Sequence, residues 1–374
     1  MSGSHMPAYD PHRPYNELPR LPPATDVETK TVLKACVRAR AALSELKLAG
    51  ELIPNQNVLI NTIPILEAKA SSEIELIVTT NDALFREASL GEGTTDPATK
   101  EALRYRTALY YGLEAIKQRP LGTNLAVEIC SHLKDQQIEV RRVPGTTLQN
   151  GTTGDIIYTP PQGEQQIRDL LANWEKFLHE PDDIDPLVKM SILHYQFEAI
   201  HPFIDGNGRT GRILNVLILA EAGLLELPTL YLSRHIVRSK PEYYGHLRGV
   251  TENGSWEPWI LYMLTAVEQT SVWTTQKVRA IRNQMEHTAE HIRFTVPKIY
   301  SRELVELMFT EPYCRIANLI AAGIAKRQTA SDYLKALVAA GVLHEEKFGR
   351  DKVFIHRAYL DLLGRETHEF QRYR

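Results

Sequence analysis

A segment in the middle of the chain reads His201-Pro202-Phe203-Ile204-Asp205-Gly206-Asn207-Gly208-Arg209-Thr210-Gly211-Arg212. Apolar residues recur at helical spacing on both sides of it, over 192–200 before it and 213–224 after it. Pro202 indicates the end of the first helix, because the residue before a proline is biased away from the α region. The sequence therefore predicts a polar, glycine-containing turn between two buried helices.

The residue types in this turn are suited to an anionic ligand. Gly206 and Gly208 let backbone N–H groups approach an anion, and the second helix points its positive dipole end at the same place. Arg209 and Arg212 are three residues apart, so they share a helix face from which both guanidinium groups can bind phosphate oxygens. We therefore expect a polyphosphate site built from backbone and arginine.

Two further residues add chemistry to this site. Asp205 offers a hard oxygen ligand, and magnesium bound to a polyphosphate takes one or two protein carboxylates. The ordinary pKa of a histidine lies near neutrality, so His201 is suited to accept a proton from a hydroxyl nucleophile.

Three other interpretations of the turn compete. Gly206, Gly208 and Gly211 spell G-x-G-x-x-G, but a dinucleotide site requires a preceding strand, and here the preceding segment has helical period. A zinc site of His194 and His201 lacks the one-turn spacing of a helical metal pair. A purely structural turn explains the glycines without explaining the polar residues gathered around them.

The segment resembles the signature of the Fic family, His-Pro-Phe-x-Asp/Glu-Gly-Asn-Gly/Lys-Arg-x-x-Arg, and agrees with it at every defined position. The resemblance implies a mainly α fold with a Fic-type helical core, and transfer of AMP from ATP to a hydroxyl side chain of a target protein. It implies His201 as the base, Asp205 as the Mg²⁺ ligand, Gly206, Asn207 and Gly208 as the phosphate-binding turn, and Arg209 and Arg212 as ligands of the β- and γ-phosphates. Because relatives include a kinase and a phosphocholine transferase, the motif specifies phosphoryl chemistry more closely than the transferred group.

An upstream helical run, 57–78, contains Ser71 and Glu75 four residues apart, which is the spacing of a solvated polar pair on one helix face. It also resembles the inhibitory helix of one Fic class, Ser/Thr-x-x-x-Glu-Gly/Asn, except that Leu76 stands where glycine or asparagine is expected. In that interpretation Glu75 pairs with Arg212 and occupies the donors that the γ-phosphate needs.

Residues 141–159 are expected to form a β-hairpin, closed by Pro160-Pro161. An ordinary surface hairpin is one interpretation. The other is the flap of Fic proteins, which holds the target segment by strand pairing. The family resemblance also places the adenine pocket after the motif, where Tyr243 or Tyr244 can stack on the base.

The last part of the chain, from about Thr295, has three short helical segments followed by a hairpin over 345–355 with its turn near Gly349. This order resembles a winged helix, with Lys326, Arg327 and Gln328 at the start of the third helix, where they can meet phosphates or bases. Winged helices also serve in protein docking and dimerisation, so a nucleic acid and a second copy of the chain both remain candidate partners.

Composition bounds the remaining expectations. A net charge of -3 argues against a protein that coats nucleic acid, and three widely spaced cysteines are typical of a reducing, cytoplasmic setting. We expect no membrane-spanning helix, and we treat Met1 to Met6 as an expression scar. Residues 7–23 are expected to form an extended arm.

The expected domains are an N-terminal helical region (1–110), a Fic core (111–294) and a winged helix (295–374).

Three hypotheses for the function follow, two enzymatic and one from another class. The leading hypothesis is a protein adenylyltransferase that uses ATP and Mg²⁺ and is restrained by Glu75. The second reverses the direction, with the same glutamate helping water to remove AMP from a modified target. The third is a regulator whose winged helix is the working part and whose core senses nucleotide.

Overall fold

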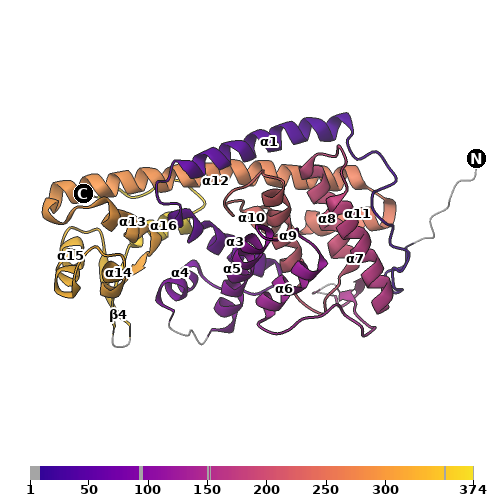
Figure 1. Cartoon of the computed structure of the whole chain (residues 1–374), viewed down its shortest axis with the longest axis horizontal. Helices are drawn as coiled ribbons and strands as arrows, with labels where there is room; N and C mark the ends of the chain where they lie inside the picture. The colour runs from indigo at the N-terminus through magenta and orange to yellow at the C-terminus, as the bar shows by residue number, and fades with distance from the viewer. Residues whose placement is uncertain (1–8, 92–95, 150, 152, 349–350, 374) are drawn as a thin grey trace, which may run out of the picture. The chain divides into compact units, whose positions relative to one another are not determined.

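The computed structural model describes residues 9–91, 96–149, 151, 153–348 and 351–373. Its contacts divide the chain into two units. Unit 1 contains the chain up to Ala42, Arg104–Glu226 and Leu232–Gln269, and unit 2 contains Leu43–Leu103, Leu227–Tyr231 and the chain from Thr270 onward. The predicted mainly α fold is confirmed, because helices make up most of both units (Figure 1).

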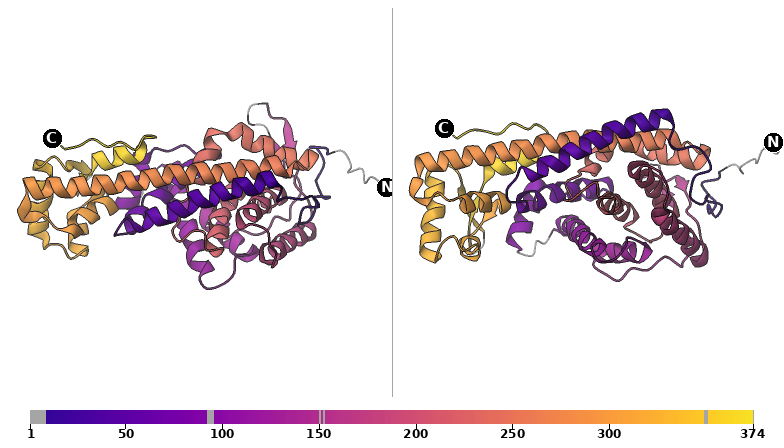
Figure 2. Two further views of the ribbon diagram at one scale, coloured as in Figure 1. Left: turned by 90° about the horizontal axis from the view of Figure 1, so that it is seen from above. Right: turned by 45° about the horizontal axis from the view of Figure 1, so that its top comes forward.

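Unit 1 is a helical body that carries one short hairpin. Its elements are the first part of α1 (Lys30–Glu51), the later part of α5 (Pro97–Ile116), α6 (Thr123–Lys134), β1 (Leu148–Gln149), β2 (Ile156–Tyr158), α7 (Glu164–His179), α8 (Pro186–Ile200), α9 (Asn207–Glu221), α10 (Leu232–Arg238), α11 (Lys240–Asn253) and the first part of α12 (Trp256–Thr295). Figure 2 shows α1 and α12 lying side by side, and within unit 1 the Arg38 guanidinium donates to the Glu268 carboxylate at 3.2 Å.

Helix α8 lies at the centre of unit 1 because its sequence is apolar on all sides. Nearly all of its residues are buried, and such a helix can only be covered by neighbours. Two tryptophan side chains hydrogen-bond its carbonyls: the Trp174 indole N–H donates to Leu193 at 3.0 Å and that of Trp259 to Ser191 at 2.8 Å. The helix begins at Pro186, and Asp185 caps it by accepting from the Leu187 N–H at 2.8 Å.

The hairpin is shorter than the sequence predicts. Its strands are antiparallel, with Leu148 opposite Tyr158, and residues 139–143 belong to neither of them. The reason is that the Arg141 N–H donates to the Pro202 carbonyl at 2.9 Å instead of to a strand partner, while Pro144 has no N–H to donate.

The expected extended arm is confirmed over residues 9–23, whereas residues 7–8 lie outside the described chain. The arm folds back along the end of the hairpin. The Tyr15 N–H donates to the Thr159 carbonyl at 3.0 Å, and the Thr159 hydroxyl donates to the Pro11 carbonyl at 2.6 Å. Further along, Asn173 of α7 exchanges two hydrogen bonds with the backbone of Leu21. The arm is thus a fixed part of unit 1.

Unit 2 joins an N-terminal group of helices to the C-terminal sheet. Its elements are the later part of α1, α2 (Asn57–Ile60), α3 (Ile63–Ile74), α4 (Asn81–Leu90), the first part of α5, the later part of α12, η1 (Pro297–Ile299), α13 (Arg302–Thr310), β3 (Tyr313–Cys314), α14 (Ile316–Ala321), α15 (Arg327–Ala339), β4 (His344–Phe348), β5 (Asp351–Ile355) and α16 (Arg357–Gly364). The single helical run expected over 57–78 is divided into α2 and α3, because Pro64 takes the first turn of α3.

The C-terminal part has the three helices and the hairpin that were expected, plus η1, β3 and α16, which were not. Strand β3 pairs with β5 and completes an antiparallel sheet in the order β3-β5-β4, and α16 follows β5. The strand is only two residues long, which is too short to give a periodic signal. The expected turn at Gly349 lies outside the described residues.

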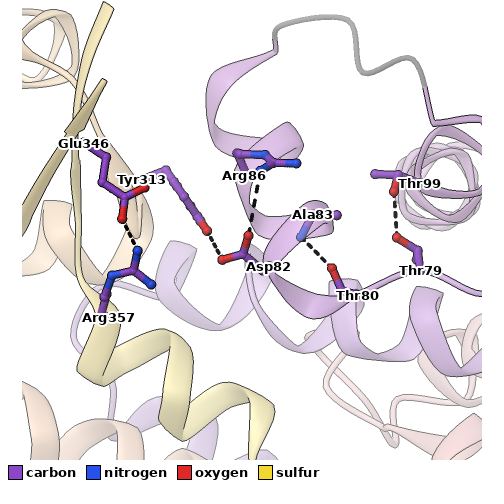
Figure 3. A network of polar contacts seen from close by, with 9 residues as sticks. All are labelled: Thr79, Thr80, Asp82, Ala83, Arg86, Thr99, Tyr313, Glu346 and Arg357. Atoms are coloured by element: carbon purple, nitrogen blue, oxygen red, sulfur yellow. Dashed lines mark hydrogen bonds and ion pairs between the residues drawn. The ribbon is translucent and has the colours of Figure 1, made fainter. Parts of the chain in front are cut away.

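A polar network attaches α4 to this sheet (Figure 3). The Tyr313 hydroxyl donates to the Asp82 carboxylate, which also lies 3.9 Å from the Arg86 guanidinium. At the start of α4 the Thr80 hydroxyl accepts from the Ala83 N–H at 3.1 Å. The N-terminal helices of unit 2 and its C-terminal sheet therefore form one body.

A buried lysine of α12 provides a test of the stability of unit 2. The Lys277 ammonium group is buried and donates to the carbonyls of Leu362, Arg365 and Thr367 at 2.7–2.9 Å. We expect Lys277→Met to lower the free energy of unfolding by about 3 kcal/mol, because one buried and two partly buried carbonyls lose a charged donor. Arg279→Met changes another residue of α12 and removes only an exposed ion pair with Glu45 of α1, so it should cost no more than about 1 kcal/mol. Urea denaturation of both variants measures the difference, and equal losses would contradict this account.

Candidate active site

His201 lies directly after the last residue of α8 and has a left-handed backbone conformation, with φ 50° and ψ 59°. A residue with a Cβ rarely adopts this conformation, because the Cβ approaches the carbonyl oxygen of its own peptide. The prediction that α8 ends before Pro202 is therefore confirmed, and the chain reverses at the residue expected to act as the base.

The turn after His201 is held by its own asparagine. The Asn207 side chain accepts from the Phe203 N–H and donates to the Phe203 carbonyl, both at 2.8 Å. Gly206 has φ 90°, and a Cβ there would lie 3.1 Å from the Cys130 sulfur, so a glycine is required. Asn207 and Gly208 form the first turn of α9, with N–H groups at the positive end of the helix dipole.

Asp205 is exposed and lies between two cations. Its carboxylate is 2.5 Å from the Lys134 ammonium group of α6 and 3.8 Å from the Arg209 guanidinium. Partial burial raises the pKa of Asp205, but the hydrogen bond and charge of Lys134, together with the charge of Arg209, outweigh it and hold this pKa below its usual value. The carboxylate is therefore ionised at neutral pH.

Lys134 is a site residue that the sequence analysis missed. It lies 71 positions before Asp205 on a different helix, and no short motif connects the two. Its proximity to the motif follows only from the packing of α6 against α9.

Both motif arginines belong to the first turns of α9 and are almost completely buried, with 2% of Arg209 and 1% of Arg212 exposed. Buried guanidinium groups require partners that satisfy their charge. Arg209 has Asp205 within ion-pair distance. The structure thus places Asp205 on the turn between α8 and α9, and Arg209 and Arg212 at the start of α9.

The two tyrosines proposed for adenine differ in exposure. Tyr243 is 1% exposed and its hydroxyl group lies 2.8 Å from Nε2 of His194, within an aromatic cluster that also contains Trp259 and Tyr262. Tyr244 is 38% exposed. Of the pair, Tyr244 is therefore the side chain with surface available for stacking, and Tyr243 is part of the core.

Ser71 and Glu75 belong to unit 2, where Ser71 is buried in α3 and Glu75 is exposed directly after Ile74, the last residue of that helix. The N–H groups of Leu76 and Ile77 donate to the carbonyls of Glu73 and Ser72, at 3.1 and 3.0 Å. This is a Schellman motif, in which the residue at Leu76 takes the left-handed conformation (φ 63°) that normally selects glycine or asparagine.

The donor set fits a metal held mainly by substrate. Among the described residues no three His, Cys, Asp or Glu side chains cluster as metal ligands. A single exposed carboxylate at a helix N-terminus is the kind of protein contact that Mg²⁺ uses when phosphate oxygens and water complete its shell. Asp205 meets that description, so the site can bind a magnesium polyphosphate while His201 accepts a proton.

Three sequence-family profiles match the chain. The profile described as Fic/DOC family N-terminal covers residues 33–114, the Fic/DOC family profile covers 121–219, and the profile of the C-terminal domain of SoFic-like protein adenylyltransferases covers 284–359. The second of these contains the whole turn from His201 to Arg212. None of the described helices is long and apolar enough to cross a membrane.

Individual relatives agree with these profiles. Protein adenylyltransferase fic-1 of Caenorhabditis elegans is 35% identical over 34% of this chain and 23% of its own length, and a probable protein adenylyltransferase of Aquifex aeolicus is 39% identical over 25% and 26%. The chain thus spans about a quarter of the curated relatives it matches. A Fic family protein from Desulfovibrio desulfuricans has the same fold, with a TM-score of 0.58 and 19% identity over 89% of this chain and 98% of its own.

The buried His194 makes stability depend on pH. Burial, together with the nearby positive charge of Arg212, lowers the pKa of His194 to about 3. Below pH 6.5 this histidine binds a proton in the unfolded chain but stays neutral in the folded chain. Its contribution to the free energy of unfolding is therefore fully present above that pH and is lost as the pH falls. Between pH 6.5 and 5 this histidine should cost about 2 kcal/mol of unfolding free energy. His194→Gln should lose this part of the pH dependence in urea denaturation, whereas His12→Gln, in the exposed arm, should retain it.

Proposed function

Because the chain carries the N-terminal and catalytic domains of the Fic/DOC family, we propose that it is a protein adenylyltransferase that transfers AMP from ATP to a hydroxyl side chain of a target protein. The observation that carries the proposal is the turn between α8 and α9. It combines His201, an ionised carboxylate, a helix N-terminus and two buried arginines within one short segment.

In the proposed reaction the target hydroxyl oxygen attacks the α-phosphorus of ATP. A new P–O bond forms to the target, the bond between the α-phosphorus and its bridging oxygen breaks, and pyrophosphate leaves with the electron pair. His201 accepts the proton of the hydroxyl group, which makes the attacking oxygen more nucleophilic. The N–H groups of the first turn of α9 and the guanidinium groups of Arg209 and Arg212 would bind the phosphate oxygens and stabilise the charge that develops.

Magnesium and localisation complete the proposal. Asp205 would hold Mg²⁺, which when bound supplies charge neutralisation to the phosphates. Lys134, which pairs with Asp205 in the structure, would then add its positive charge beside the same phosphates. The three buried, unpaired cysteines agree with a reducing, cytoplasmic setting.

His201→Ala should abolish transfer of AMP, because no other group then accepts the hydroxyl proton; a loss of 10²-fold to 10⁴-fold is typical of a removed general base. The measurement is incorporation of α-labelled ATP into proteins of a lysate and into the enzyme itself, with mass spectrometry of the acceptor. His246→Ala, a histidine of α11 outside the turn, serves as the control. Persistent labelling by the His201 variant would contradict the assignment.

We further propose that Glu75 restrains the enzyme by pairing with Arg212 in place of the γ-phosphate. Two observations support this. Glu75 and Leu76 occupy the end of α3 in the backbone arrangement that a Ser/Thr-x-x-x-Glu-Gly/Asn pattern specifies, and Glu75 is exposed. Because an ion pair with a guanidinium group would occupy the donors that phosphate needs, the carboxylate and the nucleotide should compete.

Glu75→Gly should therefore raise the rate of AMP transfer, by about tenfold or more if the competing ion pair is worth about 1.4 kcal/mol. Glu73→Gly is the matched control, since it makes the same change two residues earlier and removes only an exposed pair with Lys69. Initial rates at equal ATP measure both. An unchanged rate in Glu75→Gly would remove the inhibitory proposal. Loss of AMP removal from a modified target in this variant would favour the reverse reaction.

A further inference from the structure

Arg141 is a buried cation that contacts the backbone on both sides of the candidate base. It is 2% exposed. Its Nε donates to the His201 carbonyl at 2.7 Å, and its Nη2 donates to the Ile200 carbonyl at 3.2 Å. The N–H of the same residue donates to the Pro202 carbonyl at 2.9 Å. One residue therefore binds three consecutive carbonyls.

Ile200 is the last residue of α8, and His201 and Pro202 follow directly after the helix. The last four carbonyls of an α-helix lack the N–H groups of a following turn, and Pro202 cannot provide one. The Tyr158 hydroxyl group donates to the preceding carbonyl, that of Ala199, at 2.7 Å. Tyr158 of β2 and Arg141, which precedes the hairpin, thus satisfy every carbonyl from Ala199 to Pro202.

The chemistry of this position favours arginine over lysine. A guanidinium group has five N–H donors in a fixed fork, and Arg141 uses them for acceptors that lie in different directions. Burial lowers the pKa of Arg141, but a guanidinium group stays protonated in proteins. The positive charge also lies at the C-terminal, negative end of the α8 dipole, which is favourable. An ammonium group is a point charge and cannot reach the same set of carbonyls.

We infer that Arg141 is a positioning residue of the proposed reaction, because it holds His201 in the left-handed conformation that places the imidazole group. This conformation costs about 1–2 kcal/mol for a residue with a Cβ, so it persists only where other contacts fix it. The hydrogen bonds from Arg141 to the Ile200, His201 and Pro202 carbonyls are those contacts.

The same guanidinium group also ties His201 to the root of the hairpin. Arg141 Nη2 donates to the Pro161 carbonyl, and the arm fixes both neighbours of the Pro160-Pro161 pair. Thr159 bonds Pro11 and Tyr15, while the Gln162 N–H donates to the Asn16 side chain at 2.8 Å. Arm, hairpin root and candidate base are therefore connected through one side chain, within unit 1.

Three variants test this role, which rests on the proposed function only for its kinetic readout. Arg141→Met removes the donors, and Arg141→Lys keeps the charge without the fork. Arg142→Met is the matched control, because the neighbouring arginine is exposed and makes surface pairs with Glu139 and Glu164. For each variant we would measure the melting temperature, the affinity for ATP and the kcat of AMP transfer at a temperature where the protein is folded.

We expect kcat to fall about a hundredfold in Arg141→Met, as for a displaced catalytic group, while the affinity for ATP changes less than about threefold. Arg141→Lys should recover only part of the loss, and Arg142→Met should match the unchanged protein. A merely structural role would lower the melting temperature of Arg141→Met and leave its kcat intact. That result, or equal losses of kcat and ATP affinity, would overturn the inference.

A measurement independent of activity separates this inference from the proposed function. Hydrogen exchange at the His201 N–H, which donates to the Phe197 carbonyl at 3.0 Å, should accelerate in Arg141→Met and Arg141→Lys but not in Arg142→Met. If the unchanged protein transfers no AMP, the proposed function fails and exchange alone decides the role of Arg141. Unchanged exchange in both Arg141 variants would overturn the inference whatever the activity. If Arg141→Met does not fold, Arg141→Lys carries both readouts.

Discussion

The structure of the site depends on how the C-terminal end of α8 is satisfied. The helix is buried along its whole length, so its last carbonyls cannot bond to water, and Pro202 prevents a further helical turn. Leaving those carbonyls unpaired would cost about 1–3 kcal/mol each. Arg141, which precedes the hairpin, and Tyr158 of β2 supply the donors. The end of α8 and the root of the hairpin are therefore a single structural feature.

This constraint explains the order of groups in the turn. Once His201 reverses the chain in a left-handed conformation, Phe203 comes within reach of the Asn207 side chain, whose two hydrogen bonds close the turn. The chain then enters α9 at Gly206, where only a glycine avoids the Cys130 sulfur. The result is a helix N-terminus and an imidazole-bearing residue on the two sides of one short loop, which is the arrangement that nucleotidyl transfer to a hydroxyl group requires.

Sequence patterns predicted the parts of this site that are local. The proline and glycine positions placed the ends of α8 and α9, and helical periodicity identified both as buried. Arg141 and Lys134 were not predicted as site residues, because they reach the turn from 60 and 71 positions away and no periodicity encodes such a contact. The sequence also could not predict which of the adjacent residues Tyr243 and Tyr244 is exposed, because only the packing of the folded chain decides that Tyr243 is buried. The first strand of the hairpin was misplaced for the same reason, since Arg141 bonds Pro202.

At the end of α3 the sequence departs from the inhibitory pattern, but the backbone conformation that the pattern specifies is kept. Among the described residues other than glycine, Leu76, Asp135 and His201 have positive φ, and each ends a helix. Asp135 is tolerated there, but leucine bears a cost, and the Glu75 carboxylate beside it lies at the negative end of the α3 dipole. Glu75 and Leu76 are thus two adjacent residues that are each unfavourable to the helix. Such residues are expected where one of them is kept for function and the rest of the fold compensates for the cost. The glycine or asparagine of the inhibitory pattern specifies a left-handed backbone conformation, and Leu76 adopts that conformation. The presence of leucine at this position therefore does not change the backbone geometry that would present Glu75.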